Sequence, residues 1–519
     1  MTQVARTATR RALNGILIAA LAGLLPVRAA APDEPRKEPA SSPQPPHLER
    51  ALAEFLALDA FRLATWGLHV ALVDPPRILF ATNDALLLKP ASNAKLFTAA
   101  LALDHLGPTG RIRTDLLPAG RVSRSGTLHG DLVVVGHGDF SAAARFHPRE
   151  SGGPFASHIH ALHAAGIRRI HGDVIADDAA FRGAHFGTGW TWDDTRHAYG
   201  APVGALNCDD NLLQVVIRWN PARSRKPLVE VTPPTSFFKF DTRGLVAAPE
   251  GTPADLGSSR VRDDRRVRLT GLLPRGNPVT HEIPVPAPAL FYAHRLVEEL
   301  TRAGIHVTGR PRHVPGAGAA LPPTRLQHTL AVESPPAAEL AANMLRPSQN
   351  LYAQALLLHV GSRATIRTPD PRGTTEAAGI LALRHFLGSM GIATNEVLLD
   401  EGSGLSRSAL VTPRAIISLL RGMERHPAGP AFLDALPVAG RDGTLRRRLR
   451  DTAAEGNLRG KTGTLRHVNA LSGFVTNRDG RRLVFSALLN AYAPSQGAPS
   501  GRQAVDEVAR LLAECPLEP

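Results

Sequence analysis

The chain has 519 residues, of which 43% are hydrophobic and 20% charged, so it can build a sizeable core and wholesale disorder is excluded. At roughly 150 residues per domain, this length predicts about three domains. The net charge of +14 would suit a nucleic-acid-binding protein, but only 6 of the 60 basic residues are Lys, and the Arg are scattered among Ala, Gly and Pro. We therefore expect no nucleic-acid partner, although a basic exterior suits anionic surroundings such as a cell wall or lipid headgroups.

The N-terminus has the pattern of a secretory signal peptide. Arg6, Arg10 and Arg11 precede an apolar run over 13–25, which leads into the small residues 29–31. This run is too short to span a bilayer, and nothing downstream resembles a membrane span. We expect a signal peptide over 1–31, a Pro-rich linker over 32–47, and an exported, periplasmic protein that is soluble or peripherally attached to wall or membrane. An ordinary N-terminal helix is the alternative, and the export route, Sec or twin-Arg, stays open.

The chain has 2 cysteines, Cys208 and Cys515, which exclude a disulfide framework but leave one bridge open in an oxidising compartment.

Hydrophobic periodicity and turn residues predict mixed elements at both ends of the chain and β-rich material between them. The N-terminal part is predicted to contain a helix over 48–64, a hairpin over 67–81, and a second helix that starts at 90–95 and ends at Leu106 before Gly-Pro. The middle is predicted to contain short strands and one helix, at 132–135, 174–176, 212–219, 229–231, 267–272 and 289–303. Helices resume at 337, and the chain is predicted to end with strands at 459–465, 468–475 and 483–489 and a helix at 503–514. Both ends would then build one domain, with the middle as an insertion.

Ser92 and Lys95 form an S-x-x-K motif at the start of a predicted helix, where residues three apart share a face. A neutral amine within hydrogen-bond reach can remove the proton of a hydroxyl and make it a nucleophile. Alone, the motif also fits a helix-capping Ser with a solvated Lys. A second copy, Ser236 to Lys239, lies in a strand-like stretch and is interpreted as a chance match.

Two further motifs follow in order. Ser348-Gln349-Asn350 is the only S-x-N in the chain, and alone it would also fit a helix cap. Lys461-Thr462-Gly463-Thr464 lies on a predicted strand, where the glycine would let another backbone approach closely. The order S-x-x-K, S-x-N, K-T-G before a C-terminal hairpin and helix is the signature of penicillin-recognising serine acyltransferases.

The chain resembles the penicillin-binding protein 4 type of D-alanyl-D-alanine carboxypeptidase/endopeptidase, peptidase family S13, over nearly its whole length after the linker. Besides the three motifs, the resemblance rests on residues 132–139, 199–207, 350–353, 402–407 and 436–445. It implies an α/β (α+β) fold with a β-lactamase/transpeptidase-like catalytic domain, and a β-rich two-domain insertion between S-x-x-K and S-x-N. We place the catalytic domain at 48–112 and 325–519, accessory domain II at 113–205 and 285–324, and accessory domain III at 206–284. The insertion is expected to contribute no essential catalytic group.

By the same resemblance, Ser92 attacks the carbonyl between two D-Ala residues of a peptidoglycan stem peptide, and β-lactams act as inhibitors. Lys95 is the general base, with its pKa lowered by repulsion from Lys461. Ser348 relays a proton, and Asn350 holds Lys95 and the substrate amide.

The expected substrate-binding residues also include Lys461, Thr462, Gly463 and Thr464. Of these, Lys461 and Thr462 would bind the terminal carboxylate, and the backbone N–H groups of Ser92 and Thr464 would form the oxyanion hole. Three further residues would read the charged side chain of the stem peptide: Asp177, Arg407 and Arg466. No cofactor or metal is expected. The sequence departs from the family at Gln354, where Glu is common, and at Glu401, where Asp is common.

Other interpretations remain open. A serine β-lactamase shares the three motifs but needs a Glu shortly before Leu-Asn, and Val203 stands in that place before Leu206-Asn207. A non-catalytic wall-binding protein with the same fold is the alternative from another class, but the intact Ser92 and Lys95 argue against it. A metal site at His158, His160, His163 and His171 is less favoured than a solvated helix face, because no H-E-x-x-H motif accompanies them.

Overall fold

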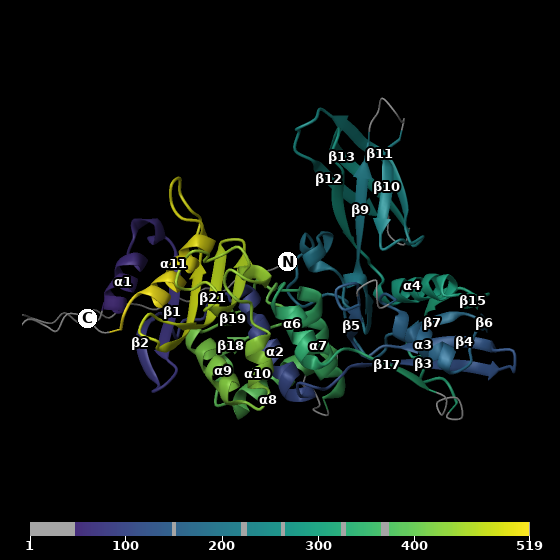
Figure 1. Ribbon diagram of the computed structural model, residues 1–519, viewed down its shortest axis with the longest axis horizontal. Helices are drawn as coiled ribbons and strands as arrows, with labels where there is room; N and C mark the ends of the chain where they lie inside the picture. Colours follow the sequence, from purple (N-terminus) through teal and green to yellow (C-terminus); the bar gives the residue numbers. More distant parts are fainter. Residues whose placement is uncertain are drawn as a thin grey trace, which may run out of the picture. The chain divides into compact units, whose positions relative to one another are not determined.

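The computed structural model describes residues 47–147, 152–219, 226–260, 265–322, 329–364 and 373–517 (Figure 1). The expected signal peptide and all of the expected linker except its last residue lie outside these ranges. Within them, no helix is both long and apolar enough to cross a membrane.

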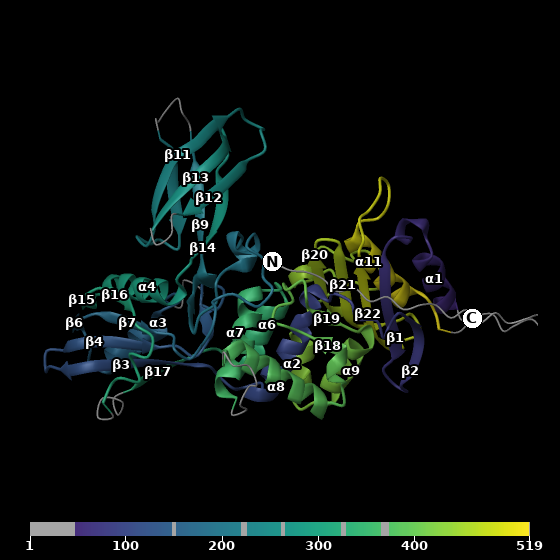
Figure 2. The same cartoon turned by 180° about the vertical axis from the view of Figure 1, so that it is seen from behind.

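A five-stranded antiparallel sheet joins the two ends of the chain. Its strand order is β2 (Arg77–Thr82), β1 (Thr65–Leu72), β22 (Arg482–Asn490), β21 (Val468–Thr476), β20 (Arg459–Leu465). One face packs against α1 (His47–Leu56) and α11 (Gly501–Glu514), and helices of a second layer cover the other face (Figure 2). Because both faces are covered, β1 and β22 are buried along almost their whole length.

The expected helix over 48–64 is shorter than the sequence indicated. α1 ends at Leu56, and a separate 3-10 helix (Asp59–Phe61) follows. This break turns Phe61 inward, where its ring lies 5.3 Å from the rings of both Phe55 and Trp66.

The central element of the second layer is α2 (Ala94–Leu106), whose residues from Ala94 to Leu103 are all buried. It is preceded by a 3-10 turn (Ala91–Asn93) and ends at Leu106, as predicted. A helix that is apolar on all sides belongs inside a domain. Its neighbours are α6 (Ala337–Leu345), α7 (Asn350–Arg363), α8 (Thr375–Ser389), α9 (Pro413–Arg425) and α10 (Gly429–Asp434). The short pair β18 (Val397–Leu398) and β19 (Leu410–Val411) lies in the same part of the chain.

Between α2 and α6 the chain forms β-rich material with its own core. A seven-stranded mixed sheet contains β3 (Arg113–Val122), β4 (Thr127–Val135), β6 (Arg169–His171), β7 (Val174–Asp177), β15 (His306–Val307), β16 (Pro311–His313) and β17 (Leu330–Glu333). The helices α3 (Ala156–Ala164) and α4 (Pro288–Arg302) accompany it, and β5 (Asp139–Ala142) pairs with β8 (Leu206–Cys208). The insertion also contains two three-stranded sheets. The strand order of the first is β10 (Leu228–Thr232), β9 (Leu212–Arg218), β14 (Val279–Pro284). The strand order of the second is β11 (Lys239–Ala248), β13 (Arg266–Pro274), β12 (Asp255–Arg260).

Three details differ from the sequence-based expectations. Residues 330–333, assigned to the catalytic domain, instead form β17, which pairs with β3 in the seven-stranded sheet. His158 does not lie on a solvated face: it is buried and hydrogen-bonded to the Tyr292 hydroxyl at 2.5 Å, because α3 turns this position toward α4. Cys208 and Cys515 are both free, buried thiols, so the bridge left open by the sequence is not formed.

Candidate active site

Ser92 lies in the 3-10 turn that leads into α2 and is half-buried. The preceding residue, Ala91, has a left-handed backbone with φ 47°, an uncommon conformation for a residue with a side chain that is often kept at functional sites. Behind it, the Asn93 amide donates a 2.7 Å hydrogen bond to the Ser472 hydroxyl on β21, which fixes the turn to the sheet. The turn that carries the Ser92 hydroxyl is therefore anchored to the five-stranded sheet.

Lys95 lies in the first turn of α2, and its ammonium group is enclosed. Nζ donates to Ser92 Oγ at 3.0 Å, Asn350 Oδ1 at 2.6 Å and the Ser403 carbonyl at 2.7 Å. Burial lowers the pKa of Lys95 to about 7, against the opposing attraction of the Glu401 carboxylate. The expected lowering is present, but its cause is burial, whereas repulsion from Lys461 was predicted.

The S-x-N motif divides its side chains between two lysines. Ser348, in a left-handed conformation with φ 63°, accepts a 2.8 Å hydrogen bond from Lys461 Nζ. Asn350, the first residue of α7, holds Lys95 through Oδ1 and donates through Nδ2 to the Tyr199 carbonyl at 2.9 Å. The capping role considered for this motif belongs to Gln349, whose side chain accepts from the Leu351 N–H. The side chains of Ser348 and Asn350 are therefore not the ones that cap α7.

The K-T-G motif lies on β20, beside the 3-10 turn that carries Ser92. Lys461 is fully buried, and burial, followed by repulsion from Lys95 and Arg448, holds its pKa well below the usual range. A Cβ on Gly463 would come within 2.7 Å of the Pro90 carbonyl, so only glycine allows this strand to approach the turn so closely.

The other two K-T-G residues face different surroundings. The Thr462 hydroxyl donates to Thr444 Oγ1 at 2.7 Å, and Thr464 is exposed.

Three residues were expected to bind the charged side chain of the stem peptide: Asp177, Arg407 and Arg466. No described contact joins any of them to the residues of the three motifs. Asp177 is buried at the end of β7, where its carboxylate accepts hydrogen bonds from three backbone N–H groups, at Ala179, Gly316 and Gly318. Arg407 is exposed and forms a 3.3 Å ion pair with Asp194 of the insertion. Arg466 is exposed just after β20.

The second S-x-x-K copy has a different environment. Ser236 Oγ lies 3.1 Å from His294 Nε2 and donates to Glu298 Oε1 at 3.0 Å, while Lys239 is exposed. The described partners of this hydroxyl are His294 and Glu298, and Glu298 contacts the same ring nitrogen that faces Ser236. This is not the arrangement of a Ser-His-acid triad, in which the acid holds the other nitrogen.

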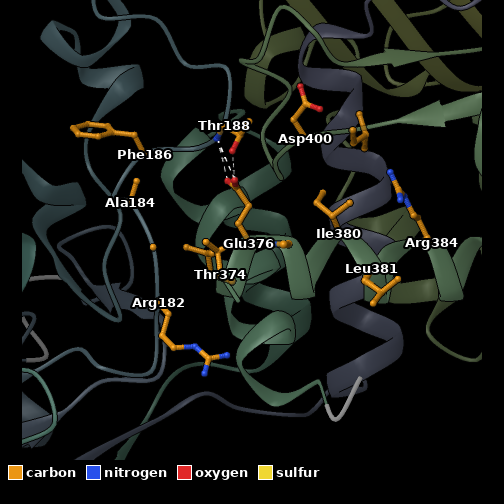
Figure 3. A pocket seen from close by; sticks show the side chains of 14 residues that line it. Arg182, Ala184, Phe186, Thr188, Thr374, Glu376, Ile380, Leu381, Arg384 and Asp400 are labelled. Atoms are coloured by element: carbon orange, nitrogen blue, oxygen red, sulfur yellow. Dashed lines mark hydrogen bonds between the residues drawn. The ribbon is translucent and has the colours of Figure 1, made fainter. Parts of the chain in front are cut away.

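The turn formed by residues 401–406 supplies the Ser403 carbonyl to Lys95. From the sequence, these six residues were assigned no role. A pocket of about 450 Å³ lies near this turn and contains none of the three motifs. Its lining includes Glu376, which accepts hydrogen bonds from Thr188 of the insertion (Figure 3). A backbone carbonyl leaves no trace in the residue type, which is why the sequence does not indicate this contact.

The geometry is that of a serine acyl-transfer enzyme: the enclosed Lys95 faces the Ser92 hydroxyl, and a second lysine, Lys461, faces the Ser348 hydroxyl. Residues 48–514 match the D-Ala-D-Ala carboxypeptidase 3 (S13) family, and the chain belongs to this family.

Relatives and solved structures agree. The chain is 31% identical over 452 residues to a D-alanyl-D-alanine carboxypeptidase of Actinomadura sp. (strain R39), covering 84% of this chain and 79% of the relative. It is 28% identical to the D-alanyl-D-alanine carboxypeptidase DacB of Haemophilus influenzae, over 81% of this chain and 84% of that protein. The crystal structure of penicillin binding protein 4 from the same organism superposes with a TM-score of 0.72 at 26% identity, over 87% of this chain and 97% of that one. A second structure of that protein, complexed with a β-lactam, gives a TM-score of 0.65 at 25% identity, over 89% of this chain and 97% of that one. The predicted fold class is confirmed.

Proposed function

We propose that the protein is a serine D-alanyl-D-alanine carboxypeptidase that acts on peptidoglycan stem peptides through an acyl-enzyme on Ser92 and is acylated by β-lactams. The observation that carries this proposal is the 3.0 Å contact between the Ser92 hydroxyl and a Lys95 whose pKa burial lowers to about 7. A base with a pKa near the working pH combines a useful neutral fraction with the strength to accept a proton.

In the first half-reaction, Ser92 Oγ gives its proton to Lys95 and bonds to the carbonyl carbon of the penultimate D-Ala. The backbone N–H groups of Ser92 and Thr464 stabilise the oxyanion, and Ser348 relays the proton held by Lys95 to the departing amine. The C–N bond then breaks and terminal D-Ala leaves. Water then attacks the remaining ester, Lys95 passes one water proton to Ser92 Oγ, and the Ser92 ester bond breaks, which completes hydrolysis.

Lys461 and Thr462 bind the terminal carboxylate of the substrate. In the free enzyme, burial and then repulsion from Lys95 and Arg448 lower the pKa of Lys461, although a hydroxyl and a carbonyl oxygen accept its hydrogen bonds at 2.8 Å each. A substrate carboxylate reverses this balance, because a nearby opposite charge raises the pKa of a lysine. Lys461 thus takes up or keeps its proton when a carboxylate arrives.

Substrate side-chain recognition is assigned to Arg407 and Arg466, which are exposed; to bind a ligand carboxylate, Arg407 has to leave its 3.3 Å ion pair with Asp194. Asp177 is the least supported member of the proposed set, since its oxygens are already hydrogen-bonded to backbone. The N-terminal 1–31 segment supports export to the periplasm, where peptidoglycan lies.

The test is mass spectrometry of a purified pentapeptide muropeptide treated with the wild-type enzyme and with Ser92→Ala. The wild type should release terminal D-Ala, a loss of one residue mass, and the variant should release none. Release by Ser92→Ala at the wild-type rate would contradict the assignment. Cleavage of cross-linked dimers in the same experiment would add endopeptidase activity.

A further inference from the structure

Lys95 faces three acceptors, of which the Ser403 carbonyl lies outside the three motifs. A neutral primary amine has two N–H bonds and one lone pair. If Asn350 Oδ1 and the Ser403 carbonyl accept the two N–H bonds, the lone pair is left pointing at the Ser92 hydroxyl. The position of the Ser403 carbonyl therefore determines whether the Lys95 lone pair points at the proton of the Ser92 hydroxyl.

Glu401 shapes the turn that carries this carbonyl. It is fully buried, and its carboxylate accepts from the N–H groups of Ser403 at 2.7 Å, Gly404 at 2.6 Å and Ser406 at 3.4 Å. A buried carboxylate that accepts several backbone N–H bonds is a strong conformational anchor. The backbone from 403 to 406 is thus wrapped around one negative charge.

The same turn is tied to both helices that carry the base and its partner. Thr98, one turn after Lys95 on α2, donates to the Gly402 carbonyl at 2.6 Å. Gln354, one turn after Asn350 on α7, accepts from the Gly402 N–H at 2.8 Å and donates to Glu376 at 2.5 Å. Glu376 in turn accepts from Thr188, the contact drawn in Figure 3.

The turn also packs directly behind the nucleophile. Gly404 has φ 76°, and a Cβ there would lie 2.0 Å from the Ala91 carbonyl. A shift of the turn would therefore displace both Ser92, through Ala91, and the Ser403 carbonyl that contacts Lys95.

We propose that Glu401 is a positioning residue for acylation: its buried carboxylate fixes the 401–406 turn so that the Ser403 carbonyl aims the Lys95 lone pair at Ser92. This inference rests on the proposed function. It deepens that function by assigning a fourth structural element to the site.

The charge of Glu401 adds a separate, measurable consequence. The charged groups around Lys95 are Glu401 on the turn and Lys461 on β20, while the 3-10 turn before α2 contributes the uncharged Ser92 and α7 contributes the uncharged Asn350. Glu376 and Arg448 lie one step further out, interacting with Glu401 and Lys461 respectively. Because Glu401 raises the pKa of Lys95, loss of its charge lowers that pKa and lets the amine be neutral at lower pH.

The experiment measures the rate constant of acylation by penicillin against pH, by intact-protein mass, in wild type, Glu401→Gln and Glu401→Asp. For the wild type we expect an acid limb near pH 7. In Glu401→Gln the limb should move down by about one pH unit, and the plateau should fall by about 10- to 100-fold because an amide cannot accept from all three N–H groups. Glu401→Asp keeps the charge, so its limb should return to the wild-type position.

The matched control is Ser406→Ala, on the same turn and equally buried, whose hydroxyl bonds outward to Asp400 at 2.9 Å. Its acid limb should stay at the wild-type pH. A purely structural role for Glu401 would lower the fraction of folded enzyme, seen as a lower thermal midpoint, without moving the limb of what remains. An unmoved limb in Glu401→Gln, or a limb in Glu401→Asp displaced as far as in the Gln variant, would overturn the inference. Absence of any wild-type adduct would instead contradict the proposed function.

Discussion

Lys95→Ala should slow acylation by a D-Ala-D-Ala peptide, by penicillin and by a carboxylate-free thioester to a similar extent. In the proposed mechanism, Lys95 accepts the Ser92 proton in every case, whatever the acyl donor carries elsewhere. Removing a positioned base typically costs about 10²–10⁴ in rate. The measurement is kcat/KM, or the acylation rate constant, for each of the three donors.

The Lys95→Ala result has a structural control. Lys239→Ala removes the exposed lysine of the second S-x-x-K copy, which has no role in the proposed mechanism, and should leave all three rates unchanged. A Lys95→Ala variant that loses activity toward only one donor would show that Lys95 binds that donor and does not act as the common base.

Lys461→Ala should instead discriminate between donors. Its predicted role is to hold a carboxylate, so peptide and penicillin should lose roughly 30-fold or more, since truncating one partner of a buried charge pair costs about 2–5 kcal/mol. The thioester lacks that carboxylate and should lose much less. Equal losses for all three donors would mean that Lys461 takes part in the chemistry through its contact with Ser348.

The sequence predicted the order of the motifs well because each motif is local. S-x-x-K places Ser92 and Lys95 on one face by helical spacing alone, and the structure has them 3.0 Å apart. The end of α2 at Leu106 was also local information, since Gly107 adopts φ 68° there. The close approach of β20 to the 3-10 turn that carries Ser92 followed from Gly463 having no side chain.

What the sequence did not predict depends on long-range packing. The enclosure that lowers the pKa of Lys95 comes from residues more than 250 positions away, and its third acceptor is a backbone carbonyl. The burial of His158 depends on α4, far along the chain. β17 joins the seven-stranded sheet because β3 offers it an edge, which no pattern within 330–333 reveals.

The insertion is also closer to the catalytic group than expected. It was predicted to supply no essential catalytic group, yet the Tyr199 carbonyl holds the Asn350 amide at 2.9 Å. This contact uses backbone, so an alanine substitution at 199 would leave it in place. The insertion thus contacts Asn350 of α7 through backbone, and in the proposed mechanism the reacting groups are those of the three motifs.

The central claim is that Ser92 is the acylated nucleophile, and intact-protein mass after incubation with penicillin tests it most directly. The lactam carbonyl imitates the scissile amide, and the opened ring cannot diffuse away to admit water. Deacylation should also be slow, because Val203 stands where a serine β-lactamase would need a Glu. We predict one persistent adduct on the wild type and on Ser236→Ala, and none on Ser92→Ala. An adduct on Ser92→Ala, or none on the wild type, would contradict the account.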